Sequence, residues 1–67
     1  SFQITDKSAN GVYFMGNRIE GSYLQRVPER LKKEAPYNIR NGDIFGVLMN
    51  KDTQNKEMLL GFEFIEG

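Results

Sequence analysis

The sequence predicts one small, mostly β domain, a sandwich or small barrel, with a single short helical segment. Short apolar, β-branched and aromatic runs recur along the 67 residues. Gly, Asn and Asp residues separate these runs at short intervals. Many short strands divided by turn residues are typical of sandwiches and barrels. Only residues 28–35 are rich in helix formers, which limits the expected helix to that stretch.

The first part of the chain contains two expected strands that a polar turn connects. Phe2–Thr5 alternates apolar and polar residues, which is the period of a strand. Residues 6–11 combine Asp, Ser and Asn, whose side chains bond to nearby backbone, with a Gly that tolerates positive φ. Val12–Met15 is β-branched and aromatic and should be a strand. Gly16–Asn17 is then expected to make a hairpin turn into a return strand that begins at Arg18.

The helical segment is expected between two prolines. Leu24, Val27 and Leu31 follow helical spacing. Pro28 fits the first turn of a helix, and Pro36 cannot continue one. The sequence therefore predicts a short helix that begins near Pro28 and ends before Pro36.

A basic cluster lies in the same segment, and it has two interpretations. It can be a phosphate-binding patch, or the solvated face of the helix, interleaved with Glu29 and Glu34. The sequence favours the solvated face, because acidic and basic residues alternate there. The cluster comprises Arg26, Arg30, Lys32 and Lys33.

The second part of the chain predicts two further strands. Asn41–Asp43 has the composition of a turn, and Ile44–Met49 that of a buried strand. Residues 50–56 form a polar loop, and Met58–Ile65 is the last strand. Within it, Gly61 marks a bulge or a close approach of two backbones. The aromatic side chains of the strands are expected in the core: Tyr13, Phe14, Phe45, Phe62 and Phe64.

The composition argues against most catalytic, metal and nucleic-acid functions. The chain has no Cys and no His, so disulfides, thiolate sites and the commonest general base are excluded. Asp6, Asp43 and Asp52 are separate turn residues without metal-ligand spacing, so we expect no enzyme activity, metal or cofactor. A formal net charge of zero argues against nucleic-acid and anionic-membrane partners.

The short length predicts at most one domain, which would need oligomerisation or unusually good packing for its stability. A chain of 67 residues without disulfides or a metal site buries a small share of its surface and needs other support. No apolar run approaches the ~20 residues that span a bilayer. The chain starts with Ser rather than Met, so we expect a processed product or a piece of a longer protein.

Two stretches resemble the second half of a forkhead-associated (FHA) domain. Residues 4–19 contain Asp-Lys-Ser-Ala-Asn-Gly, a strand, and Gly-Asn-Arg-Ile; residues 39–45 contain Ile-Arg-Asn-Gly-Asp-Ile-Phe. The family has a strand that ends in Asp, Ser-Ser/Thr-Asn-Gly-Thr, a strand, Asn-Gly with a basic residue, and later Gly-Asp before another strand. The resemblance implies an FHA/SMAD-like antiparallel β-sandwich that binds phosphothreonine peptides.

The resemblance also implies which residues form the peptide site. Asn10 matches the residue that holds the peptide backbone, Ser8 and Gly11 shape its turn, and Ala9 replaces a phosphate-binding Ser or Thr. Met15 replaces a second Asn, and Val12 replaces a Thr. Residues 50–56 correspond to another loop of the binding end, which adds Asn50 and Asp52.

The front half of the family pattern is missing. Its phosphate-gripping Gly-Arg and Ser-x-x-His are both absent from this sequence. Residues 1–67 are therefore expected to be a single domain or the C-terminal portion of one, with an insertion at about 20–38. Front strands would come from another segment or chain.

The family suggests a non-catalytic, intracellular and nuclear role in signalling, including the DNA damage response. Two other interpretations stay open: an FHA-like scaffold or dimerisation element without phosphate recognition, and, for residues 8–11, an ordinary turn that joins two strands.

Overall fold

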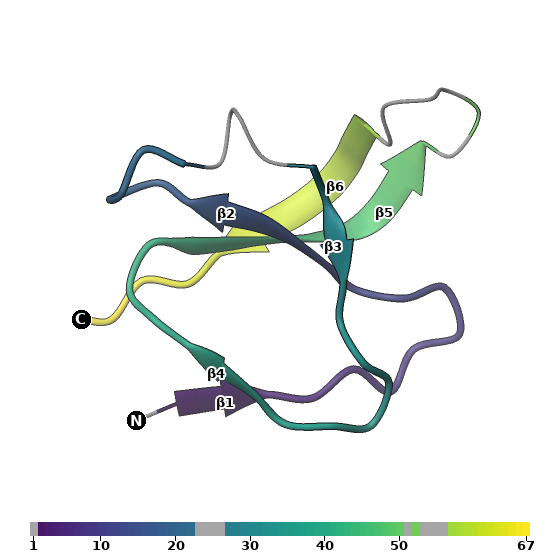
Figure 1. Ribbon diagram of the computed structural model, residues 1–67, viewed down its shortest axis with the longest axis horizontal. Coiled ribbons are helices and arrows are strands. Elements are labelled where there is room, and N and C mark those ends of the chain that lie inside the picture. The colour runs from purple at the N-terminus through teal and green to yellow at the C-terminus, as the bar shows by residue number, and fades with distance from the viewer. Residues whose placement is uncertain (1, 23–26, 51, 53–56) are drawn as a thin grey trace.

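Six strands are the regular elements of the computed structural model, which describes residues 2–22, 27–50, 52 and 57–67 (Figure 1). They pair in two antiparallel sheets, one of two strands in the order β1-β4 and one of four in the order β3-β2-β5-β6. The prediction of an all-β antiparallel fold is thus confirmed. The strands are β1 (Phe2–Ile4), β2 (Tyr13–Asn17), β3 (Glu29–Arg30), β4 (Tyr37–Ile39), β5 (Asp43–Asn50) and β6 (Glu57–Glu63).

The predicted helix is wrong: residues 28–35 contain no helix, and β3 occupies part of this stretch. The segment instead runs beside the first part of the chain, with a strand at Glu29–Arg30 and a turn at residues 34–35. The N–H of Leu31 donates to the carbonyl of Val12 at 2.8 Å, and that of Glu34 donates to the carbonyl of Asp6 at 2.8 Å. A short helix has little stability of its own, so these long-range backbone bonds override its propensity. Leu24, part of the helical spacing, lies outside the described residues.

The predicted hairpin turn at Gly16–Asn17 is also wrong, because β2 continues through both residues. Gly16 pairs with Ile44 and Asn17 with Asp43 in β5. The register shifts between Phe14 and Gly16, and Gly16 has a φ of 114°. A glycine with positive φ is as suitable for a β-bulge as for a hairpin turn. The chain turns later, over residues 18–21, and no return strand begins at Arg18.

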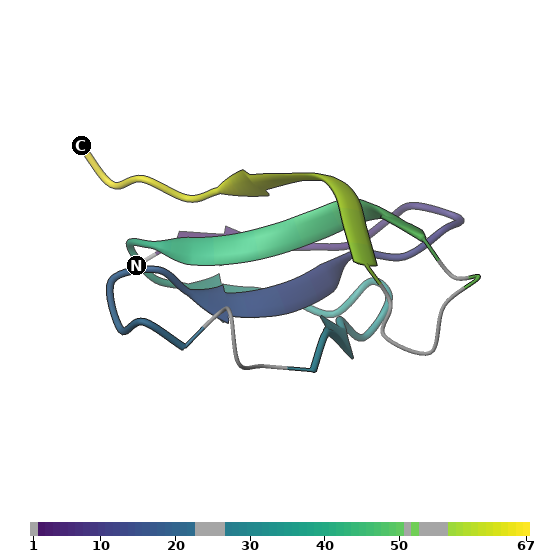
Figure 2. The same ribbon diagram turned by 90° about the horizontal axis from the view of Figure 1, so that it is seen from above.

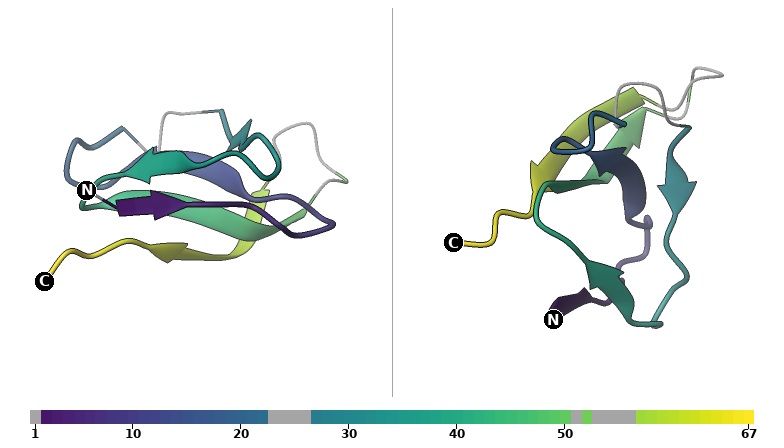
Figure 3. Two further views of the ribbon diagram at one scale, coloured as in Figure 1. Left: turned by 90° about the horizontal axis from the view of Figure 1, so that it is seen from below. Right: turned by 60° about the vertical axis from the view of Figure 1, so that its left-hand side comes forward.

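The core lies between the two sheets. Val12, Phe14, Leu31 and Phe45 form its buried centre, and side chains of β1 and β4 pack against it. The Phe14 and Phe45 rings are 5.6 Å apart, and Tyr37 contacts both at 5.7 and 5.9 Å. Figure 3 shows the β1–β4 pair across from β2 and β5, with the chain that follows β3 along one side. The expected core positions of Phe14 and Phe45 are confirmed.

β5 and β6 depart from the expected burial. Val47 and Leu48 are 37% and 49% exposed, so Ile44–Met49 is not buried throughout as predicted. The register between β5 and β6 shifts on both sides of Leu48. Figure 2 shows that both strands bend toward their loop-side ends. Phe62 stacks on Phe45 at 5.5 Å but stays 41% exposed, because β6 is an edge strand with a partner on one side only.

Gly61 confirms the expected close approach. It pairs with Gly46, and a Cβ on Gly61 would collide with the carbonyl oxygen of Phe45 and lie 3.3 Å from the Cα of Gly46. Only a residue without a side chain fits at this crossing. None of the described residues forms a helix that is long and apolar enough to cross a membrane.

Candidate functional site

A buried carboxylate fixes the turn between β1 and β2. Asp6 is 1% exposed, and its Oδ1 accepts hydrogen bonds from the N–H of Ser8 at 2.8 Å and the hydroxyl of Ser8 at 2.6 Å. Its Oδ2 accepts the N–H of Val12 at 3.1 Å. The Ser8 hydroxyl in turn accepts the N–H of Gly11 at 3.0 Å. The predicted tight turn is therefore confirmed, and its local side-chain bonds give it a defined shape.

These bonds also lower the pKa of Asp6. The Ser8 hydroxyl makes the largest contribution and the Ser8 N–H the next, while burial opposes them. The Val12 N–H and the positive charge of Arg30 lower the pKa further. Donors that bond to a carboxylate stabilise its charged form, so Asp6 is held ionised inside the turn.

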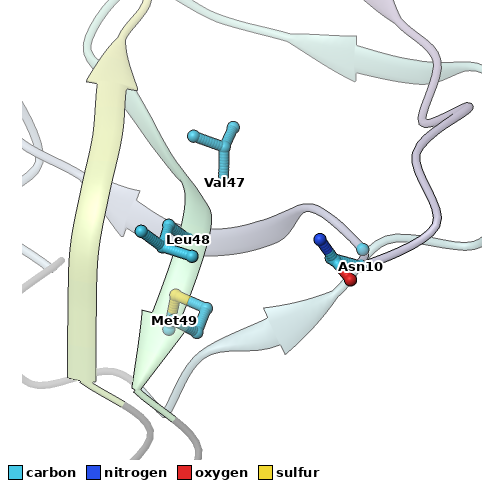
Figure 4. Close-up of a pocket in the computed structure, with 5 residues that line it drawn as sticks. Asn10, Val47, Leu48 and Met49 are labelled. Atoms are coloured by element: carbon cyan, nitrogen blue, oxygen red, sulfur yellow. The ribbon is translucent and has the colours of Figure 1, made fainter.

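Asn10 projects from this turn at the rim of a hollow whose β5 side is apolar. The hollow has a volume of about 240 Å³ and is lined by Asn10, Gly11, Val47, Leu48 and Met49. Figure 4 shows Asn10 across from the three β5 side chains. Asn10 is exposed, and its amide makes no hydrogen bond to any other residue in the described part of the chain. A free carboxamide beside an apolar surface can bond to a peptide backbone while a side chain enters the hollow.

The other residues predicted for the site are not all brought to this hollow. Ala9 is exposed on the turn next to Asn10. Met15 is half-buried on β2, with its sulfur 3.6 Å from where a Cβ on Gly46 would lie. Asn50 ends β5, and its Oδ1 accepts the N–H of Asp52 at 3.1 Å. Residues 51 and 53–56 of the predicted binding loop lie outside the described residues.

A basic side chain lies against the same turn. Gly11 has a φ of 92°, and a Cβ built on it would lie 2.7 Å from Nε and 3.0 Å from Cζ of Arg30. Gly11 is therefore required by its backbone conformation, and the Arg30 guanidinium lies against it. Arg30 comes from β3, which pairs with β2 through Tyr13. A helix over this segment would not have paired with β2 or set Arg30 beside Gly11. Arg30, Lys32 and Lys33 are all exposed, and Arg26 lies outside the described residues.

A second buried polar cluster joins the other end of β2 to β5. The Asn17 amide donates to Asp43 at 2.7 Å and to the carbonyl of Asn41 at 3.0 Å, and Asp43 accepts the N–H of Arg40 at 2.7 Å. Both side chains are almost fully buried. Every buried polar side-chain atom among the described residues has a hydrogen-bond partner, so this cluster is structural. In the same part of the chain, no three acidic residues are grouped to hold a metal ion.

Sequence reasoning missed the residues from Val47 to Met49 as parts of the site. For the basic cluster that includes Arg30, it favoured a solvated face over a phosphate-binding patch. An apolar run such as Ile44–Met49 indicates a buried strand, and no sequence signal marks the bulge that exposes Val47 and Leu48. The signal for Arg30 was its place in a basic cluster, but the helical interpretation separated it from the turn.

Comparison with models of known protein families, with curated proteins and with solved structures found no match to this chain.

Proposed function

We propose that this chain belongs to an FHA-like β-sandwich and forms one wall of a phosphothreonine-peptide site used in intracellular signalling. The proposal rests on the surroundings of the Asn10 side chain. Its amide makes no hydrogen bond to the other described residues, stands on a turn that Asp6 and Ser8 hold in shape, and borders a hollow with apolar β5 side chains. A rigid polar anchor beside an apolar surface is the arrangement that an extended peptide requires.

In this proposal, Asn10 bonds to the backbone of the peptide next to the phosphothreonine. The hollow formed with Val47, Leu48 and Met49 accepts an apolar side chain of the same peptide, because its β5 wall carries no charge. Ser8 acts through the shape of the turn, since its hydroxyl already bonds to Asp6 and Gly11. Ala9 offers no hydroxyl to a phosphate.

The proposal includes a further segment that supplies the front strands. β6 lies at the edge of its sheet, and it exposes Leu59, Leu60 and Phe62 by 60%, 59% and 41%. An exposed edge with contiguous apolar side chains is unusual for a finished sheet and fits one that further strands cover. The 67-residue chain alone is therefore expected to bind phosphopeptides weakly.

The test is a library of phosphothreonine peptides and their unphosphorylated counterparts, with binding measured by fluorescence polarisation. Phosphorylated peptides should bind more tightly than their unphosphorylated counterparts. Asn10→Ala should lower the affinity for them about tenfold, the effect expected from the loss of one or two hydrogen bonds. Asn38→Ala is the matched control, because Asn38 is also exposed but lies in β4 and does not line the hollow. Equal affinities of the two variants would contradict the role of Asn10.

The exposed edge of β6 also favours a second candidate, a scaffold or dimerisation element that does not recognise phosphate. In that case partner binding follows the apolar residues of β6 and is unchanged by Asn10→Ala. Substituting Leu60 with Ser should then weaken the partner complex, while phosphorylation of the partner has no effect.

A further inference from the structure

We propose that Arg30, a residue of the segment between β2 and β4, supplies a cation that binds the phosphate in the site around Asn10. The inference rests on the proposed function and adds a specific residue to it. The front half of the FHA pattern, with its Gly-Arg, is missing from the sequence, so a phosphate-binding cation from this chain would have to come from elsewhere.

The placement of Arg30 carries the inference. β3 pairs with β2 through Tyr13, and the chain continues along the turn, where the N–H of Leu31 bonds to the carbonyl of Val12 at 2.8 Å. This pairing sets the Arg30 guanidinium against Gly11, whose Cβ position would be 2.7 Å from Nε. Gly11 also lines the hollow beside Asn10. Arg30 thus lies against Gly11, the residue that follows Asn10 in the turn.

Arg30 is available for a ligand. It is exposed, and it makes no hydrogen bond or ion pair with any residue in the part of the chain that the structure describes. The carboxylate that it faces is Asp6, whose oxygens already accept three hydrogen bonds from Ser8 and Val12. Glu29 precedes Arg30 in the strand, and neighbouring strand residues point to opposite faces.

The chemistry of arginine suits a phosphate monoester. Its planar guanidinium donates two parallel hydrogen bonds to phosphate oxygens and stays charged at every physiological pH. Lys32 follows on the same exposed segment and adds positive charge without this fork geometry. Ala9 has no hydroxyl, so at this turn a donor to phosphate would come from Arg30 and not from residue 9.

The test is an NMR titration of the 67-residue chain, a method that measures the weak binding expected of this chain alone. Two probes are used, a capped phosphothreonine dipeptide and the same dipeptide with threonine. NMR spectra first verify that each variant keeps the dispersed amide signals of the wild type. We expect the phosphorylated probe, and not the unphosphorylated one, to shift the NMR signal of the Arg30 side-chain Nε–H. Arg30→Gln should weaken binding of this probe about tenfold or more, and Arg30→Lys should weaken it less. Lys32→Gln, with the same charge change, should have an effect of less than about threefold.

The outcomes separate the inference from the proposed function. If the phosphorylated probe binds and Asn10→Ala weakens it, but Arg30→Gln behaves as Lys32→Gln, the proposed function stands and the role of Arg30 is refuted. If Arg30→Gln weakens binding and Asn10→Ala does not, Arg30 is the phosphate contact and the assigned role of Asn10 is wrong. Equal binding of the two probes to the wild-type chain would refute both.

Discussion

The hydroxyl of Ser8 donates to the buried carboxylate of Asp6 at 2.6 Å, and this bond organises the turn that presents Asn10. The same carboxylate accepts hydrogen bonds from two backbone N–H groups, those of Ser8 and Val12. Between β1 and β2, this side chain therefore bonds to backbone groups that a neighbouring strand would otherwise pair. The shape of the candidate site therefore depends on the ionisation of a residue that lies behind it.

Acid should weaken the fold through Asp6. The pKa of Asp6 is lowered from its ordinary 3.8 in the folded state, chiefly by the Ser8 hydroxyl. A carboxylate whose folded pKa is depressed contributes stability that is present above its unfolded pKa and is lost as the pH falls through the folded pKa. Thermal unfolding is followed by circular dichroism from about pH 6 to about pH 2. The Tm of the wild type should fall over this range, and the Tm of Asp6→Asn should fall less. Asp52→Asn makes the same charge change at an exposed position, and an identical acid profile for the two variants would contradict this prediction.

The Asn17 side chain should matter for stability far more than an exposed Asn. Its amide bonds to Asp43 and to the carbonyl of Asn41, and its Oδ1 accepts the N–H of Glu20 at 2.9 Å. Asn17→Ala leaves these buried groups without partners, which costs about 1–3 kcal/mol. Urea denaturation measures the change, and Asn38→Ala is expected to stay within about 0.5 kcal/mol. A similar loss of unfolding free energy in both variants would contradict the prediction that the buried hydrogen bonds of Asn17 stabilise the fold.

A methyl group at Gly61 should destabilise the sheet. The added Cβ would meet the carbonyl oxygen of Phe45, a backbone atom that cannot move without distorting β5. Overpacking of this kind costs about 1–3 kcal/mol. Gly67→Ala is the control, because a Cβ at Gly67 meets nothing within 4 Å. The prediction is wrong if the two variants unfold at the same urea concentration.

The turn chemistry was the most predictable part of the candidate site. Asp, Ser, Asn and Gly within residues 6–11 bond to their own backbone, so the turn depends on neighbours in the sequence. The Asn41–Asp43 turn was predicted for the same reason. In contrast, Gly16–Asn17 suited both a hairpin turn and a bulge, and the pairing of β2 with β5 decided between them.

The segment after Pro28 shows the limit of local propensity. Its residues favour a helix, but Leu31 enters the core, and its N–H bonds to Val12 far back in the chain. β4 also escaped prediction, because its strand partner is β1, far away at the start of the sequence. Long-range pairs of this kind leave no periodic signal within either segment.

The sequence by itself determined the β character of the chain, its tight turns and the position of Asn10, because these follow from side chains that act on their immediate neighbours. The tertiary structure alone decided that Arg30 lies against Gly11 and that Val47 and Leu48 line a hollow. Both depend on strand pairing, β3 with β2 and β5 with β6, and the register of such a pair is set by the packing of distant residues.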